Sequence, residues 1–483
     1  MNLRLSHARA LTRREFLRRS GKFSLGAIAL DALTPGVFAK ARSENPLAPK
    51  APPLPSKVKS VIYLSMSGAP PQHDLFDWKP ELVKHHLQDC PAELMKGQTF
   101  AFIKGTPKLL GTSRKFAQQG KSGAWVSDAL PHFTTIVDDV AIVRSMNTNQ
   151  FNHAPAELFL YTGNMLAGSA SMGSWLTYGL GSENQDLPGY VVLLSGGSDP
   201  TGGKSCWGSG FLPSVYQGVQ CRAAGEPILY ANNPPGMDRG SRRRSLDALK
   251  ALNEAEAAQF GDPETLTRIQ QYELAYRMQM AVPEVMDIAK EKPETIEAYG
   301  AKPGEASFAN NCLLARRLVE QGVRFVQLFD WGWDIHGTGA SDDLLNKFPK
   351  KCEEVDRPCA ALIQDLKERG LLDSTLVIWG GEFGRTPMNE ARGGSTFLGR
   401  DHHPHAFSMW MAGGGVKPGI VFGETDELGY FVTQDKVTVR DLQATVMHLM
   451  GFDPYKISYR YQGLNNRLIG PTNEGQVVKG LLA

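Results

Sequence analysis

The sequence lacks several features that would place it in a special class of protein. No uninterrupted apolar run approaches the roughly 20 residues that a membrane-spanning helix needs. There is no Cys-x-x-Cys pair, which disfavours a thiolate metal site. Hydrophobic residues make up 42% and charged residues 21% of the 483-residue chain, a balance that excludes wholesale disorder. The composition therefore predicts a globular protein without a transmembrane anchor.

The chain also lacks a large net charge, because 52 Lys and Arg residues stand against 50 Asp and Glu residues. This balance hides an asymmetry. Residues 1–41 carry eight Lys or Arg and two acidic residues, whereas the rest of the chain is mildly acidic. The one basic run in that remainder, Arg239 to Arg244, is short, so no nucleic-acid partner is predicted. The basic N-terminal segment instead indicates a targeting sequence.

Residues 12–18 read Thr-Arg-Arg-Glu-Phe-Leu-Arg and match the twin-arginine export consensus. A mildly apolar stretch follows, and small residues after it allow cleavage after Ala39 or Ala41. We therefore predict a twin-arginine signal peptide over residues 1–41, read by the twin-arginine export machinery, and a location in the periplasm or cell envelope. Such a compartment permits disulfides, and Cys206 with Cys221 is the expected pair.

A Pro-rich linker is predicted over residues 42–56, followed by one α/β domain over residues 57–483. Apolar strand patterns alternate there with helices of crossover length, which predicts a mostly parallel central sheet with helices on both faces. A helical insertion is predicted at about residues 245–300, broken at Pro263 and Pro283. The predicted strands cover residues 58–64, 141–144, 190–194, 323–329, 375–379 and 406–411.

Acidic and histidine residues cluster next to these strands. The carboxyl ends of parallel strands meet at one edge of a sheet, where the ligand crevice lies, so we expect these side chains to converge. Carboxylate and imidazole groups suit a divalent ion such as Zn²⁺, Mn²⁺ or Ca²⁺, whose identity the pattern leaves open. The candidate metal ligands are Asp74, Asp334, His336, Glu382, His402 and His403.

Spacing along extended chain sorts some of these candidates. Asp334 and His336 stand two residues apart and share a face. His402, His403 and His405 cannot all point the same way, so at least one is expected to be structural or solvent-facing. Two arginines in the same clusters, Arg385 and Arg400, are suited to hold an anionic oxygen.

Taken together, these clusters resemble the bacterial exported family catalogued as domain of unknown function 1501, which is sulfatase-like and has the fold of the alkaline phosphatase superfamily. The resemblance covers essentially the whole mature chain. It rests on the stretches Asp74 to Pro80, His153 to Gly163, Gly173 to Gly181, Trp333 to His336, Gly381 to Pro387 and Gly399 to Pro404.

The resemblance implies a metal-dependent hydrolase of phosphate or sulfate esters, acting on a small-molecule or glycan substrate. Sulfatases place their nucleophile first in Cys/Ser-x-Pro-x-Arg, and this chain has His153 there, with Glu157 in place of the arginine. Where the superfamily has a metal-binding Asp-His pair, this chain resembles it with Glu382-Phe383, which keeps the carboxylate and lacks the imidazole.

Three mechanisms stay open. Metal-activated water would attack the ester directly. Alternatively, His153 would act as nucleophile or general acid/base, with Arg385 as a second catalytic residue. The third alternative is a non-catalytic envelope binding protein that kept the fold without the nucleophile.

Overall fold

In the computed structural model, residues 45–228, 233, 236–260, 263–472 and 474–483 are described. A nine-stranded sheet runs through the centre in the order β14-β5-β13-β9-β1-β8-β6-β7, with β17 pairing on β5. The expected mostly parallel sheet is confirmed, and β13 is the exception, because it runs antiparallel to both β5 and β9. The strand bounds are β1 Ser60–Ser67, β5 Val140–Asn147, β6 Tyr190–Ser195, β7 Val219–Cys221, β8 Phe325–Trp331, β9 Thr375–Gly380, β13 Phe407–Ala412, β14 Ile420–Phe422 and β17 Val437–Thr438.

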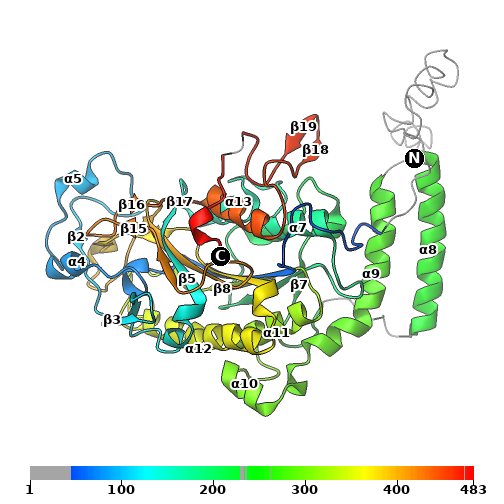
Figure 1. Ribbon diagram of the computed structural model, residues 1–483, viewed down its shortest axis with the longest axis horizontal. Coiled ribbons are helices and arrows are strands. Elements are labelled where there is room, and N and C mark those ends of the chain that lie inside the picture. Colours follow the sequence, from blue (N-terminus) through cyan, green and yellow to red (C-terminus); the bar gives the residue numbers. More distant parts are fainter. Residues whose placement is uncertain (1–44, 229–232, 234–235, 261–262, 473) are drawn as a thin grey trace.

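Helices cover both faces of the sheet, as predicted (Figure 1). On one face lie α11 (Phe308–Glu320) and α12 (Lys347–Glu368), and on the other lie α6 (His153–Thr162), α7 (Met172–Leu180) and α13 (Val439–Leu449). Strands β1, β8 and β9 are buried almost throughout, which matches their continuous apolar sequences.

The helical segment expected at about residues 245–300 forms α8 (Arg239–Phe260), α9 (Pro263–Met286) and the short α10 (Pro293–Tyr299). Helix α8 packs on α9, and α9 contacts α11 at the β7 end of the sheet (Figure 1). The predicted break at Pro283 is wrong, because α9 continues through Pro283 to Met286. In the described residues no helix is both long and apolar enough to cross a membrane.

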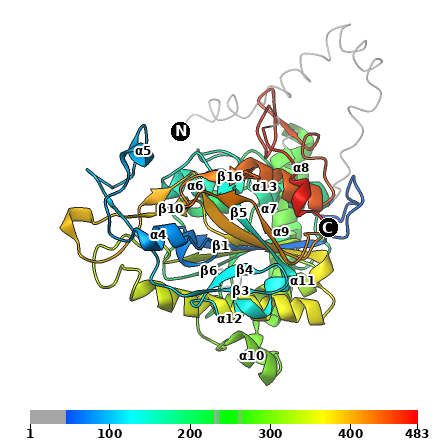
Figure 2. The same cartoon turned by 60° about the vertical axis from the view of Figure 1, so that its left-hand side comes forward.

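Smaller elements lie around the sheet. Figures 1 and 2 show the β3–β4 hairpin (Phe116–Gln119 and Ala124–Ser127) beside α12. The remaining short elements of the described residues are α4 Pro80–Lys84, α5 Ala92–Met95, β2 Lys108–Leu109, β10 Gly384–Arg385, β11 Met388–Asn389, β12 His402–His403, β15 Glu424–Thr425, β16 Val432–Gln434, β18 Tyr459–Tyr461 and β19 Leu464–Asn466, together with several short 3-10 turns.

Two expectations outside the sheet have definite outcomes. The predicted signal peptide lies outside the described residues, and residues 45–56 of the predicted linker lie along the body, where Leu47 is buried and Leu54 donates to Gly451. The predicted disulfide is wrong, because Cys206 and Cys221 are free, buried thiols. Cys221 pairs with Leu193 in the sheet, whereas Cys206 belongs to a separate 3-10 turn that packs on α6.

Candidate metal centre

Three histidines from separate elements converge on one carboxylate. His153 begins α6, Asp334 and His336 follow β8, and His402 belongs to β12. The distances from Asp334 Oδ1 are 2.7 Å to His336 Nε2, 3.2 Å to His153 Nε2 and 3.4 Å to His402 Nε2. These four residues are a group that could hold a metal ion, with ligand atoms all within 4.8 Å of one another.

The opposite ring nitrogen of each histidine is held by an oxygen. His153 Nδ1 lies 2.5 Å from Glu382 Oε1, and His402 Nδ1 lies 2.6 Å from the carbonyl oxygen of Phe151. His336 Nδ1 contacts a carboxylate oxygen of Glu390. When each Nδ1 donates to its oxygen, each Nε2 is left as a lone pair facing Asp334. This is the arrangement in which second-shell oxygens orient imidazoles toward a metal.

Arg385 contacts the same oxygen of Asp334 as the three histidines. Its guanidinium lies 2.5 Å from Asp334 Oδ1 and also donates to the backbone carbonyls of Gly68, Ala69 and Arg400. The side chain is 1% exposed, so it has no free face for a substrate. Arg385, expected to be catalytic, thus lies against Asp334 and three backbone carbonyls in this structure.

The pairing of β10 with β12 decides which histidine joins the cluster. The antiparallel register sets His402 opposite Arg385 and His403 opposite Gly384. Because neighbouring residues of a strand point to opposite faces, His402 turns to Asp334 while His403 Nε2 lies 2.6 Å from the carbonyl oxygen of Tyr430. His403 is therefore held outside the cluster.

Gly68 brings the loop after β1 into contact with the cluster. Its N–H donates to Glu382 Oε1 at 3.0 Å. Its φ is +104°, and a Cβ there would lie 2.5 Å from the backbone nitrogen of Asp334. Only glycine combines this backbone conformation with such a close approach.

Asp74 also lies outside the cluster. Its carboxylate faces the fully buried Arg400, with 2.8 Å between Arg400 Nε and Asp74 Oδ2. Arg400 donates further to the carbonyl oxygens of Leu110 and Thr386. In this structure the carboxylate of Asp74, expected to be a metal ligand, is therefore paired with Arg400 and not grouped with the histidines.

The pKa values of His153 and His402 are shifted in opposite directions. Burial lowers the pKa of His153, but the carboxylates of Asp334 and Glu382 outweigh it and raise this pKa to about 9. Burial dominates at His402 and lowers its pKa to about 4. Although burial acts against ionisation, Arg385 and the histidines hold the pKa of Asp334 far below its usual range. A negative carboxylate therefore stays at the centre of the cluster at any physiological pH.

The donor set fits a divalent ion of the Zn²⁺ or Mn²⁺ type. Glu382 is fully buried, and within the described part of the chain no Lys or Arg forms an ion pair with it. Its Oε2 and His153 Nε2 are buried atoms without a hydrogen-bond partner there. Three imidazole Nε2 atoms around one carboxylate, beside a buried Glu382 oxygen that has no partner in the described structure, match the donor atoms that a bound divalent ion prefers.

Sequence reasoning missed Glu390 and Arg392. Glu390 is nearly buried and holds His336, while Arg392 pairs with Glu390 at 2.5 Å and lies over the ring of Phe102, 3.6 Å from its centroid. Arg392 is 39% exposed, so it is the arginine of this group that faces solvent. The only available signal was their position in the loop shortly after Arg385.

Glu157, one turn beyond His153 on α6, is a second buried acid near the cluster. Its Oε2 accepts hydrogen bonds from Thr201 Oγ1 at 2.8 Å and from the N–H of Gly202 at 2.7 Å, and its Oε1 has no partner in the described structure. Burial, reinforced by the charge of Glu382, raises the pKa of Glu157 to about 7.

We expect Glu157→Gln to remove a pH-dependent loss of stability in protein freed of metal by a chelator. The unfolded chain loses this proton near its ordinary pKa of 4.5, whereas the folded chain loses it near 7. The folded state therefore binds more protons in this window, and stability falls as pH rises through it, by about 3 kcal/mol in total. Urea unfolding from pH 4.5 to 8 measures this. Equal pH profiles for the wild type and the variant would show that Glu157 titrates normally.

A search of curated proteins found no match. Among solved structures, a sulfatase, PsFucS1 from Pseudoalteromonas sp., is 13% identical, with 82% of this chain and 68% of that chain covered and a TM-score of 0.34. A phosphonate monoester hydrolase from Silicibacter pomeroyi is 12% identical, with 89% and 76% covered and a TM-score of 0.33. Alkaline phosphatase from the Antarctic bacterium TAB5 is 11% identical, with 79% and 97% covered and a TM-score of 0.28.

The family comparison covers nearly all of the described body, including every residue of the cluster. Protein of unknown function (DUF1501) is the family whose model matches residues 58–482, and the chain belongs to that family.

Proposed function

We propose that this protein is an exported, metal-dependent hydrolase that cleaves phosphate or sulfate esters with activated water. The observation that carries the proposal is the convergence of three Nε2 atoms on Asp334, with every Nδ1 held by an oxygen. His153, Asp334, His336 and His402 would hold the ion. A divalent ion in such a site polarises an ester oxygen and lowers the pKa of water toward neutrality. The ester class follows from the family resemblance.

The residues around the cluster have separable roles in this proposal. Glu382 and Glu390 orient His153 and His336, and Arg385 orients Asp334. Both ring nitrogens of His153 face carboxylates, which favours a ligand role over a nucleophilic one.

In this proposal, two groups would bind the anionic part of an ester. Arg392 offers a partly exposed guanidinium beside His336. Helix α6 begins at His153, and the side chain of its N-cap residue Asn152 makes no capping hydrogen bond. Of the first residues of α6, His153 and Ala154 carry an N–H that would donate to an anion next to the cluster, whereas Pro155 has none and the N–H of Ala156 donates to Asn152.

Metal analysis followed by an ester panel tests this function. We expect the mature protein, loaded separately with Zn²⁺, Mn²⁺ and Ca²⁺, to retain a stoichiometric ion and to hydrolyse an aryl phosphate or aryl sulfate. Glu382→Gln and Glu390→Gln should each weaken metal binding by roughly 10–100-fold, because Glu382 holds His153 Nδ1 and Glu390 holds His336 Nδ1. The exposed Glu424, whose Oε2 accepts from Gln434, supplies the control variant Glu424→Gln.

The outcomes of these measurements are distinct. A protein that binds no ion would contradict the metal site itself. One that binds an ion tightly but cleaves no ester would contradict the hydrolase and support an envelope binding protein on the same fold.

Export by the twin-arginine route to the periplasm or cell envelope is part of the proposal. It rests on the twin arginines, Arg13 and Arg14, in the consensus at residues 12–18. Replacing both by lysine should leave the full-length chain in the cytoplasmic fraction. Unchanged export of that variant would contradict the route.

A further inference from the structure

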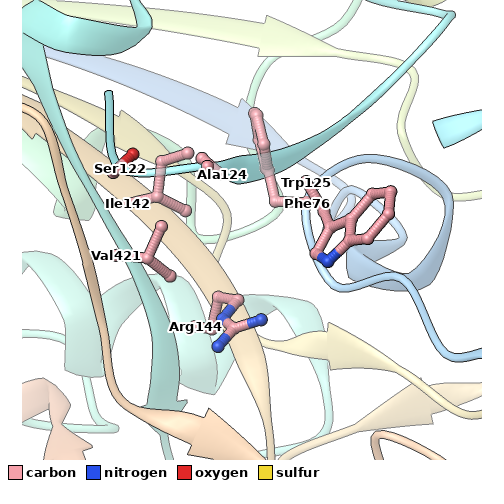
Figure 3. A pocket seen from close by; sticks show the side chains of 8 residues that line it. Phe76, Ser122, Ala124, Trp125, Ile142, Arg144 and Val421 are labelled. Atoms are coloured by element: carbon pink, nitrogen blue, oxygen red, sulfur yellow. The ribbon is translucent and has the colours of Figure 1, made fainter. Parts of the chain in front are cut away.

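A separate pocket of about 220 Å³ opens between the β3–β4 hairpin and the edge of the main sheet. Figure 3 shows Ile142 and Val421 on one side of it, Trp125 across from them, and Arg144 at one end. Residues Phe76, Ser122, Gly123 and Ala124 complete the lining. None of the lining residues belongs to the metal cluster.

Arg144 is poorly satisfied by its own protein. A guanidinium has five N–H donors. In the described structure the only hydrogen bond from Arg144 runs from Nη2 to the carbonyl oxygen of Gly423, at a long 3.4 Å. Its Nε is buried and has no partner there. Unmatched buried donors of a charged group are costly, so the guanidinium is poised to bind an acceptor.

The carboxylate nearest to Arg144 is shared with a second cation. Asp77 lies 3.8 Å from Arg144 Nη1 but only 3.1 Å from Lys79 Nζ, and it accepts from Thr425 Oγ1 at 2.5 Å. The side chains of Arg144, Lys79 and Asp77 are 20%, 11% and 0% exposed. Two cations therefore share one carboxylate in a partly buried place, which leaves a positive charge beside the pocket.

The other lining residues indicate the chemistry of the rest of the ligand. Phe76, Trp125, Ile142 and Val421 present aromatic and aliphatic surface, and Arg144 is the charged residue that lines the pocket. Ser122, Gly123 and Arg144 make part of the lining polar, so apolar walls and one charged group converge on the same space, as in many small-molecule sites. A planar carboxylate matches the fork of a guanidinium, whereas a fully hydrated inorganic anion gains nothing from apolar walls.

We propose that this pocket binds a small organic carboxylate with a compact apolar body, held by Arg144 and packed between Trp125 and Val421. The site is independent of the proposed hydrolase, because it requires neither the ion nor any residue that would hold it.

Titration calorimetry of the mature, metal-free protein with benzoate as the probe tests this proposal. We expect one benzoate per chain, with benzamide and inorganic phosphate at least about tenfold weaker, because each lacks either the charge or the apolar body. Arg144→Gln should cost about tenfold or more, and Arg144→Lys should cost less. Ala124→Leu fills the pocket while keeping Arg144, so it should weaken benzoate binding to a similar degree.

Equal binding of benzoate and benzamide, or unchanged affinity in both Arg144→Gln and Ala124→Leu, would overturn the proposal. So would the absence of benzoate binding at millimolar concentration. Circular dichroism of each variant confirms that it is folded. If Arg144→Gln does not fold, the Ala124→Leu and Arg144→Lys variants still decide the result. Loss of the metal site leaves benzoate binding intact, so failures of the two proposals are distinguishable.

Discussion

Asp334→Asn is expected to abolish metal binding and, with it, ester hydrolysis. Asp334 Oδ1 is the atom on which the Nε2 atoms of His153, His336 and His402 converge. Asparagine keeps the shape of the side chain but removes its charge and one lone-pair-rich oxygen. The loss of affinity should exceed the roughly 10–100-fold expected for residues that only orient ligands. Equilibrium metal competition and atomic absorption measure it.

The control for this variant is Asp89→Asn. Asp89 forms a surface ion pair with Lys108 and is 72% exposed. Its loss should leave metal content and turnover unchanged. Because Asp334 also balances Arg385, unfolding of the metal-free proteins is compared as well, so that loss of metal is separated from loss of fold. Full metal content in folded Asp334→Asn would show that the ion binds elsewhere.

Arg400→Met is expected to lower the free energy of unfolding by about 3–5 kcal/mol, because it leaves a buried carboxylate without its partner. Arg400 is 0% exposed, and its guanidinium satisfies Asp74 and the carbonyl oxygens of Leu110 and Thr386. Urea unfolding at neutral pH measures the effect. The double variant with Asp74→Asn should recover part of the loss, since it removes the unpaired charge.

The single variant Asp74→Asn tests whether Asp74 is a metal ligand. With its carboxylate committed to Arg400, Asp74→Asn should reduce stability and leave the metal stoichiometry unchanged. A folded Asp74→Asn protein with less bound metal would instead make Asp74 a ligand, as the sequence analysis predicts.

Local periodicity predicted most of the sheet and helices. The buried apolar runs at 323–329 and 375–379 became β8 and β9, shifted by no more than two residues, because a fully buried strand needs a short continuous apolar segment. The departures have causes that local periodicity does not contain. Pro283 stays inside α9 although proline usually disrupts a helix interior, and the antiparallel direction of β13 depends on pairing with strands far away in sequence.

The cluster was only partly predictable. Asp334 and His336 could be grouped because two residues of extended chain share a face, which is a local property. The choice between His402 and His403 depends on the register of β12 against β10, and no residue near His402 in sequence carries that information. Glu390 belongs to no recognisable motif, because its contact with His336 depends on how its loop packs in the folded chain.

What the sequence alone determined is the alternation of strands and helices, the family, and the set of loops that carry acids and histidines. The tertiary structure decided which of those side chains meet. It places His153 beside Asp334 and pairs Asp74 with Arg400. The physical reason is that strand patterns and residue types are local properties, whereas a ligand set depends on distances between segments hundreds of residues apart. Those distances follow from sheet order and from close contacts such as that of Gly68 with Asp334.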